Sequence, residues 1–171
     1  AGEESGVKSC IDAAAGRPLI GVFHAAGTDL IGPIEETTAE DVEKLFQPKV
    51  KGAWLLHRAT SDLTSIRFFV CFSSISSVWG SKGRGVYAAA NAFLDTLANY
   101  RRDIGLPALS VNFGPWKGGG MADDEALAEL RRIGNEGLEP TAALDTTAHL
   151  LDTGDSQGVV ADVDWSRFRP V

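Results

Sequence analysis

The 171-residue chain lacks the features that mark membrane, secreted and nucleic-acid-binding proteins. It has no recognisable signal peptide and no apolar run of ~18 residues, the length that crosses a bilayer. Its two cysteines, Cys10 and Cys71, form neither a disulfide framework nor a metal-binding spacing, which favours a reducing compartment. Acidic residues outnumber basic residues, and the net charge of −7 argues against nucleic acid or an anionic membrane as the main partner. We therefore expect a cytoplasmic protein.

Four short apolar runs predict the strands of a parallel sheet. Each is almost continuously apolar, as in strands covered on both faces, and they span residues 18–23, 66–72, 106–113 and 158–163. Helical patterns lie between and after them, at residues 38–60, 87–102, 123–133 and 140–151, the first with a capping box at Thr37–Glu40. Strands that alternate with helices indicate an α/β doubly wound sheet, and the length suits one domain with a single core.

One part of a nucleotide-binding α/β fold has no counterpart in this sequence. No G-x-G-x-x-G turn occurs, and residues 6–15 have the pattern of the end of a helix rather than of a first strand. We therefore predict a single Rossmann-like domain over residues 1–171 that holds only the second half of the fold, with the first βαβ half absent. The strand at 18–23 would then form an exposed apolar edge.

The residues best suited to chemistry are Ser74, Tyr87 and Asn91. Ser74 follows the second apolar run, where parallel sheets place ligands, and Tyr87 begins an Ala-rich helical stretch thirteen residues later. Asn91 lies four residues further on, on the same helical face. A serine and a tyrosine so placed can hold a ketone oxygen and protonate it while hydride arrives from elsewhere. Each could also be an ordinary loop or packing residue, and only their combination favours a carbonyl reductase.

A tyrosine that acts as an acid needs a nearby cation, because its unperturbed pKa is about 10. Many reductases place a lysine four residues after the tyrosine, but that position is Asn91 here. Lys49 is the alternative, since it falls on the apolar stripe of the helix at 38–60, although it could instead snorkel at the edge of that stripe. Pro48 is expected to loosen the helix at this point.

Other residues near the expected pocket have two open interpretations. Trp116, just past the third strand, is either core packing or a wall for a planar cofactor ring. Trp79 lies in a glycine-rich loop that would wall the pocket. His57 is more simply a partly buried helix residue than a base, and the three histidines are too scattered for a metal site. The glycines at 118–120 would form a mobile hinge.

In this order, these residues resemble the ketoreductase domains of modular polyketide synthases, within the short-chain dehydrogenase/reductase superfamily. The resemblance extends from about residue 7 to the C-terminus, and the combination of motifs is far more specific than any one of them. The motifs are Val22-Phe23-His24-Ala25-Ala26-Gly27, Pro48-Lys49-Val50-Lys51-Gly52-Ala53-Trp54, Phe72-Ser73-Ser74, Tyr87-Ala88-Ala89-Ala90-Asn91-Ala92-Phe93-Leu94-Asp95, Val111-Asn112-Phe113-Gly114-Pro115-Trp116 and Val160-Ala161-Asp162-Val163-Asp164-Trp165.

The resemblance implies NADPH-dependent reduction of a β-ketoacyl group carried on an acyl carrier protein, during polyketide biosynthesis. It implies that Tyr87 donates the proton and Ser74 orients the ketone. Lys49 would assist Tyr87, and Asn91 would hold the lysine or a relay water. The cofactor would then lie against two segments, His24, Ala25, Ala26 and Gly27 on the ribose side and Pro115 and Trp116 on the nicotinamide side.

The resemblance also carries an expectation about stereochemistry. Trp79 stands eight residues before the tyrosine, as in domains that give the L-hydroxyl, or A-type, product. Residues 28–31 do not match the Leu-Asp-Asp of domains that give the D-hydroxyl. Arg84, not histidine, stands three residues before the tyrosine, so the subtype that selects the α-epimer is not indicated. Met121 and the helix after it would form the substrate lid.

We expect the chain to be the C-terminal portion of a ketoreductase catalytic domain, inactive alone because the pyrophosphate turn and the 2′-phosphate site are absent. Its partners would be the N-terminal half, the neighbouring synthase domains and the carrier-bound substrate. One alternative is a non-catalytic structural module of the synthase. Another is a free-standing short-chain reductase, which Asn91 in place of lysine and the ending Asp162–Trp165 argue against.

Overall fold

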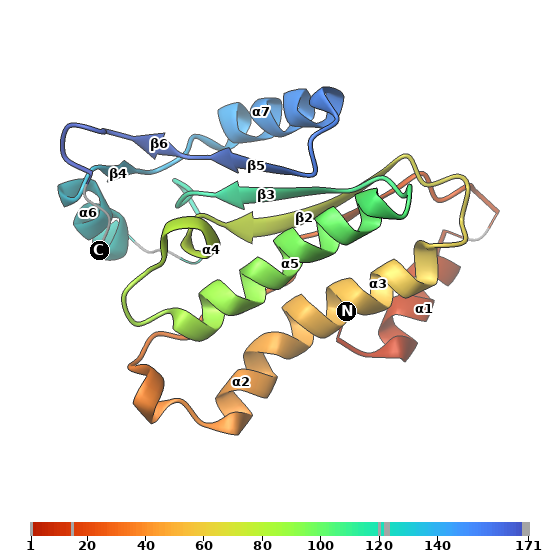
Figure 1. Ribbon diagram of the computed structural model, residues 1–171, viewed down its shortest axis with the longest axis horizontal. Coiled ribbons are helices and arrows are strands. Elements are labelled where there is room, and N and C mark those ends of the chain that lie inside the picture. The colour runs from red at the N-terminus through yellow and green to blue at the C-terminus, as the bar shows by residue number, and fades with distance from the viewer. Residues whose placement is uncertain (1, 15, 120, 122–123, 169–171) are drawn as a thin grey trace.

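A four-stranded parallel sheet organises the chain in a computed structural model that describes residues 2–14, 16–119, 121 and 124–168 (Figure 1). Its order is β1-β2-β3-β5, with β1 at Gly21–His24, β2 at Phe68–Ser74, β3 at Leu109–Phe113 and β5 at Gln157–Val160. The carboxyl ends of these strands all lie toward the same end of the sheet, because every pairing is parallel. A separate antiparallel ribbon pairs β4 (Asn135–Glu136) with β6 (Asp162–Val163).

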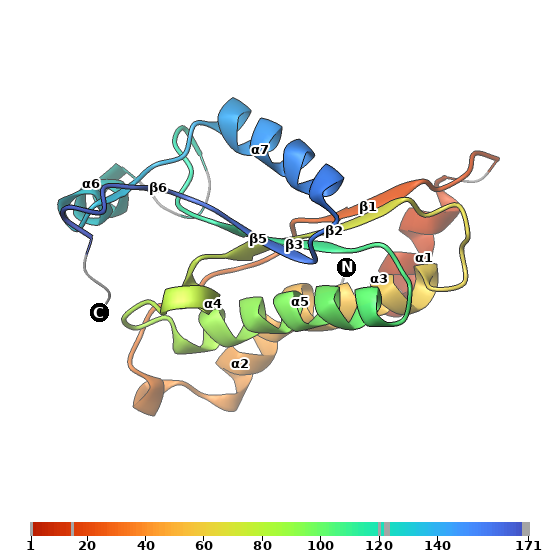
Figure 2. The same ribbon diagram turned by 45° about the horizontal axis from the view of Figure 1, so that its top comes forward.

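Helices cover both faces of the sheet (Figure 2). One face carries α2 (Ala39–Phe46), the π-helical turn η2 (Gln47–Lys51), α3 (Gly52–Thr60) and α5 (Gly85–Asp103), and the other carries α7 (Pro140–Thr153). The remaining elements are α1 (Glu4–Asp12) beside α3, the 3-10 turn η1 (Ile34–Glu36), α4 (Ser76–Trp79) and α6 (Asp124–Arg132). The doubly wound α/β arrangement is therefore confirmed. None of the helices in the described ranges combines the length and the apolarity needed to span a bilayer.

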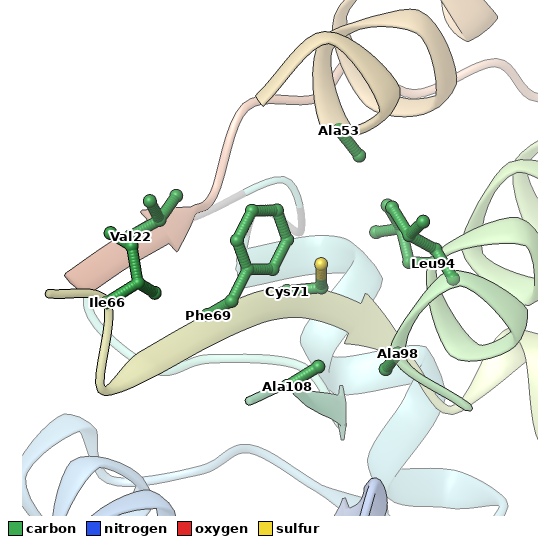
Figure 3. Close-up of a cluster of buried hydrophobic side chains, with 9 residues drawn as sticks. Val22, Ala53, Ile66, Phe69, Cys71, Leu94, Ala98 and Ala108 are labelled. Atoms are coloured by element: carbon green, nitrogen blue, oxygen red, sulfur yellow. The ribbon is translucent and has the colours of Figure 1, made fainter. Parts of the chain in front are cut away.

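Both faces of β2 are buried, which explains why its sequence is continuously apolar. Phe69 and Cys71 pack against Ala53 of α3 and Leu94 of α5 (Figure 3). Val70 points the opposite way and belongs to a second apolar cluster, on the side that α7 covers. A strand with helices on both faces leaves no position for a polar residue until it reaches its carboxyl end.

β1 is one of the two edge strands of the parallel sheet in the described part of the chain, and β5 is the other. The outward-facing Phe23 of β1 is 57% exposed, and Ile20 just before the strand is 52% exposed. Phe23 contacts Phe68 on the neighbouring strand, with ring centroids 5.2 Å apart. The apolar edge predicted from the sequence is present.

β1 and β3 each begin three residues later than the runs predicted for them, and four further local features differ from the sequence-based expectations. The run 158–163 forms two strands, because β3 ends at Phe113 and leaves no partner beyond Val160, so the chain turns to pair with β4 instead. The capping box uses Thr38 and Asp41, one residue later than predicted. The first helix begins at Glu4, although only the end of a helix was expected there, and α4 replaces an expected loop.

Two other expected features, a helix start at Asp123 and a hinge that includes Gly120, involve residues outside those described.

A buried carboxylate ties the longest helix to the strands. Asp95 of α5 accepts hydrogen bonds from the hydroxyls of Ser77 and Ser110, both at 2.6 Å, and from Asn112 Nδ2 at 2.9 and 3.0 Å. Ser77 belongs to α4, and Ser110 and Asn112 belong to β3. Asn112 also donates to Ser73 Oγ at 3.1 Å. These bonds fix α4, α5 and the ends of β2 and β3 relative to one another.

We predict that Asp95→Asn lowers the free energy of unfolding by about 2–3 kcal/mol, because an amide presents a donor where hydroxyl and amide donors converge. Urea unfolding of the variant measures the loss. Asp103→Asn, at the exposed end of the same helix, is the matched control and should stay within about 0.5 kcal/mol of the wild type. Equal stabilities of the two variants would contradict the structural role of Asp95.

Candidate active site

A pocket of about 830 Å³ lies at the carboxyl ends of β1, β2 and β3. The segments that leave these strands supply its base, through Ala25, Ser74 and Pro115. Open α/β sheets bind ligands here because the chain leaves each strand toward one or the other face and opens a crevice between them. Leu130 near the end of α6 and Phe168 in the C-terminal segment also line the pocket.

Ser74 ends β2 with its hydroxyl held by the next turn. Its Oγ accepts hydrogen bonds from the backbone N–H of Ser76 at 3.2 Å and from the Ser76 hydroxyl at 3.0 Å. Because both interactions use lone pairs of the oxygen, the hydroxyl proton of Ser74 stays available for another acceptor. The predicted placement of Ser74 at the strand end is confirmed.

Lys49 reaches the site from the π-helical turn η2. The turn contains Pro48, which has no N–H for the helical ladder, so the loosening expected there is confirmed. The Lys49 side chain is only 4% exposed, and its ammonium donates to the Phe72 carbonyl at 3.2 Å. The same ammonium lies 5.5 Å from the centre of the Tyr87 ring. Lys49 therefore points inward, and the snorkelling alternative is wrong.

The turn after β1 fits closely around Lys49. His24 is buried, and its Nε2 lies 3.1 Å from the Lys49 carbonyl oxygen, so this ring supports the backbone of the π-helical turn. Burial also lowers the pKa of His24. A Cβ added to Gly27 would lie 2.9 Å from Lys49 Cε, and Ala26, the residue before Gly27, is half-buried. Glycine at position 27 thus leaves the space that the lysine occupies.

Tyr87 and Asn91 lie one helical turn apart near the start of α5, and both are buried. Asn91 Nδ2 donates to the Tyr87 backbone carbonyl at 2.8 Å. Asn91 Oδ1 is buried without a hydrogen-bond partner among the described residues. A buried acceptor without a partner costs free energy. The Asn91 oxygen is therefore suited to accept a hydrogen bond from a water molecule or an ammonium.

Burial shifts both ionisable groups at this site toward their neutral forms. It raises the pKa of Tyr87, while the side chains of Ser74 and Asn91 act in the opposite direction. It lowers the pKa of Lys49 to about 8, against the opposing effect of negative charge at Asp95 and Asp29. Tyr87 therefore keeps its proton at neutral pH, and Lys49 keeps most of its charge there but loses it in mildly alkaline solution. Such shifts are frequent at catalytic sites.

Four further residues predicted from the sequence also border the pocket. Pro115 and Trp116 line it from the end of β3, Trp79 from α4, and Met121 from the segment before α6. Trp116 packs on Phe113 with ring centroids 4.9 Å apart. Among the residues expected on the cofactor's ribose side, Ala25 lines the pocket, whereas His24 does not line it and contacts the backbone carbonyl of Lys49.

Sequence reasoning missed three features of the site. Asp29 and Arg84 form an ion pair that joins the loop after β1 to the loop before Tyr87, and neither stands in a pattern that predicts it. Asp95 had one detectable signal, since it lies four residues after Asn91 on the same buried face of α5. Phe168 had none, because it approaches the pocket only through the antiparallel ribbon.

Comparisons with known proteins point to one family. The family model described as "KR domain" matches residues 1–118. Polyketide synthase GfsA from Streptomyces halstedii is 41% identical over 174 residues, which covers 99% of this chain but 2% of that protein. The chain therefore spans only a small part of the curated relatives that it matches.

Solved structures give the same result at the level of the fold. A ketoreductase from the first module of phoslactomycin biosynthesis in Streptomyces sp. HK803 matches with a TM-score of 0.91 and 43% identity, over 99% of this chain and 40% of that one. A structure described as an A-type ketoreductase from a modular polyketide synthase matches with a TM-score of 0.92 and 35% identity, over 98% of this chain and 36% of that one.

The lowered pKa of Lys49 gives a prediction about stability. Between pH 8 and pH 10.5 the unfolded chain binds a proton at Lys49 that the folded chain does not, so stability rises with pH in this window. Relative to Lys49→Met, the wild type should gain about 3 kcal/mol across the window, and the difference should be constant below it. Urea unfolding at several pH values measures this difference.

Lys51→Met, which removes an exposed lysine from the same turn, is the matched control. A constant difference between the wild type and Lys49→Met from pH 7 to pH 10 would contradict the burial of the Lys49 ammonium.

Proposed function

Because the chain belongs to the KR-domain family, the ketoreductase domains of polyketide synthases, we propose that it reduces a β-ketoacyl thioester to the β-hydroxyacyl product. The observation that carries this proposal is the meeting of Ser74, Lys49 and Tyr87 in one pocket at the carboxyl ends of the strands. A hydroxyl donor, a phenol acid and a cation are the groups that a developing alkoxide needs.

Each of these residues has a role that its contacts support. Ser74 donates its free hydroxyl proton to the ketone oxygen, since its oxygen already accepts from Ser76. Tyr87 transfers its proton to the same oxygen as negative charge develops there. Lys49, held near the Tyr87 ring, stabilises the phenolate that remains. Asn91 holds a relay water or the lysine through its unpaired Oδ1.

The pocket suits the nicotinamide half of NADPH, which supplies the hydride when it is bound. Pro115 and Trp116 give an apolar wall of the kind that a planar ring packs against. Because Gly27 has no Cβ, the end of the Lys49 side chain lies close to the turn after β1, where the ribose would pack. The binding residues for the adenine and the 2′-phosphate would belong to an N-terminal βαβ half.

We further propose that this chain works together with such a half and with an acyl carrier protein that carries the substrate. The chain spans 40% of the phoslactomycin ketoreductase that it matches, and the exposed apolar edge of β1 offers a place for further sheet structure. The β-hydroxyl product would have the L configuration, because Trp79 lines the pocket and residues 28–31 do not form a Leu-Asp-Asp motif.

The first test is NADPH oxidation with a β-ketoacyl thioester by a reconstituted enzyme, this chain combined with the N-terminal half. Tyr87→Phe should lower kcat by at least ~10²-fold, because it removes the proton donor but keeps the ring. Tyr100→Phe is the matched control, since Tyr100 is the other tyrosine of the chain and lies exposed on the same helix.

Each part of the proposal can fail separately in this assay. Full activity of Tyr87→Phe would contradict the assignment of the proton donor. Turnover by the chain alone would contradict the need for an N-terminal half. A reconstituted protein that binds NADPH but does not reduce the thioester would favour a structural module of the synthase.

A further inference from the structure

The C-terminal segment of the described chain returns to the pocket and adds an aromatic ring to its wall. Phe168 lines the same pocket as Ser74 and Tyr87, although it lies far from both in the sequence. Its ring packs on Trp79 with centroids 5.0 Å apart and planes at 55°. Trp79 also lines the pocket, so the two rings form one continuous section of wall.

A tight turn fixes Phe168 in place. The backbone carbonyl of Asp164 accepts hydrogen bonds from the N–H groups of Arg167 at 3.0 Å and Phe168 at 2.8 Å. The Asp164 carboxylate accepts from the Ser166 backbone N–H at 3.0 Å and the Ser166 hydroxyl at 2.6 Å. Phe168 thus follows a turn whose backbone and side-chain hydrogen bonds limit its position.

The turn also packs closely against the segment that follows α6 and is hydrogen-bonded to it. Gly134 has φ of +85°, and a Cβ there would lie 2.7 Å from both the Asp164 carbonyl oxygen and the Phe168 nitrogen. The backbone N–H of Asp164 donates to the Gly134 carbonyl at 2.8 Å. Glu136 bridges the two segments, with ion pairs to Arg131 at 3.5 Å and Arg167 at 3.1 Å. The end of α6, the ribbon and the turn therefore form one unit beside the pocket.

We propose that Phe168 is a specificity-determining residue that holds the Trp79 indole against the acyl part of the substrate. This inference rests on the proposed function and deepens it. Without the Phe168 ring, the indole loses a face of its packing and can take other rotamers, and the pocket becomes wider beside it. The ketone can then present either face to the hydride, while the proton-donating groups around Tyr87 stay unchanged.

The test compares Phe168→Leu with Trp165→Leu in the reconstituted enzyme. Trp165 is the matched control, because it lies on the same turn and touches Phe168, but it is 71% exposed and does not line the pocket. An aromatic pair is worth roughly 0.5–1.5 kcal/mol, so Phe168→Leu should lower the ratio of the two β-hydroxy epimers by about two- to twelvefold. KM for the thioester should rise, and the pH dependence of kcat should not move.

A double-mutant cycle with Trp79→Leu tests whether the two rings act together. Once Trp79 is removed, Phe168→Leu should give no further loss of the epimer ratio, because its effect passes through the indole. Additive losses, an unchanged ratio in Phe168→Leu, or an equal loss in Trp165→Leu would each overturn the proposal. If Phe168→Leu unfolds, Phe168→Met replaces it, since methionine keeps most of the buried volume.

A second measurement separates this inference from the proposed catalysis. With 5-fluorotryptophan incorporated, the ¹⁹F resonance of Trp79 is assigned by its loss in Trp79→Phe. Titration with the β-ketoacyl thioester should shift this resonance, with an apparent Kd that is severalfold higher in Phe168→Leu and unchanged in Trp165→Leu. Binding without reduction would count against the proposed function alone, whereas equal Kd values in all three proteins would overturn the role of Phe168.

Discussion

The hydrogen bonds of Asp95 are the constraint on which the arrangement of the pocket depends. A carboxylate in the interior is tolerated only when its oxygens are satisfied, and here Ser77, Ser110 and Asn112 satisfy them. Because these donors come from α4 and β3, the hydrogen bonds to Asp95 hold both elements against α5, the helix that also carries Tyr87. The turn after Ser74 and the helix that begins near Tyr87 are thereby held together. Their relative position decides whether two hydroxyls can meet one substrate oxygen.

Burial acts on Lys49 in two opposing ways. It places the ammonium beside Tyr87, and it also lowers the pKa of the lysine, which weakens the charge that makes the residue useful. Negative charge at Asp95 and Asp29 limits the loss. Asp95 therefore has a second effect beyond its hydrogen bonds, since its charge helps to keep the buried lysine protonated. The site trades some stability for a cation in an apolar place, as functional sites often do.

The order of elements and several candidate residues could be predicted because they follow from local patterns. A run such as Phe68–Phe72 is apolar throughout only when both faces of a strand are covered, and this one is. The spacing of Lys49 on a helical stripe left both an inward and a snorkelling position open, and the structure places its side chain inward from a π-helical turn at Pro48. Trp79 and Trp116 were expected near the pocket because they follow the carboxyl ends of β2 and β3, Pro115 was expected there from the family resemblance, and all three line the pocket. The catalytic roles of these residues stay predictions.

By itself, the sequence determined the α/β class, the strand ends at which the site lies and the candidates Ser74, Tyr87 and Asn91, while the choice of Lys49 rested on the family resemblance. Periodicity and strand-end position carry the first part of that information, since both are properties of neighbouring residues. Only the tertiary structure decided that the last apolar run divides between the sheet and the ribbon, that Asp29 pairs with Arg84, and that Phe168 packs on Trp79. Those contacts join residues far apart in the chain, and their formation depends on where β3 ends and on a backbone conformation at Gly134 that leaves no space for a Cβ.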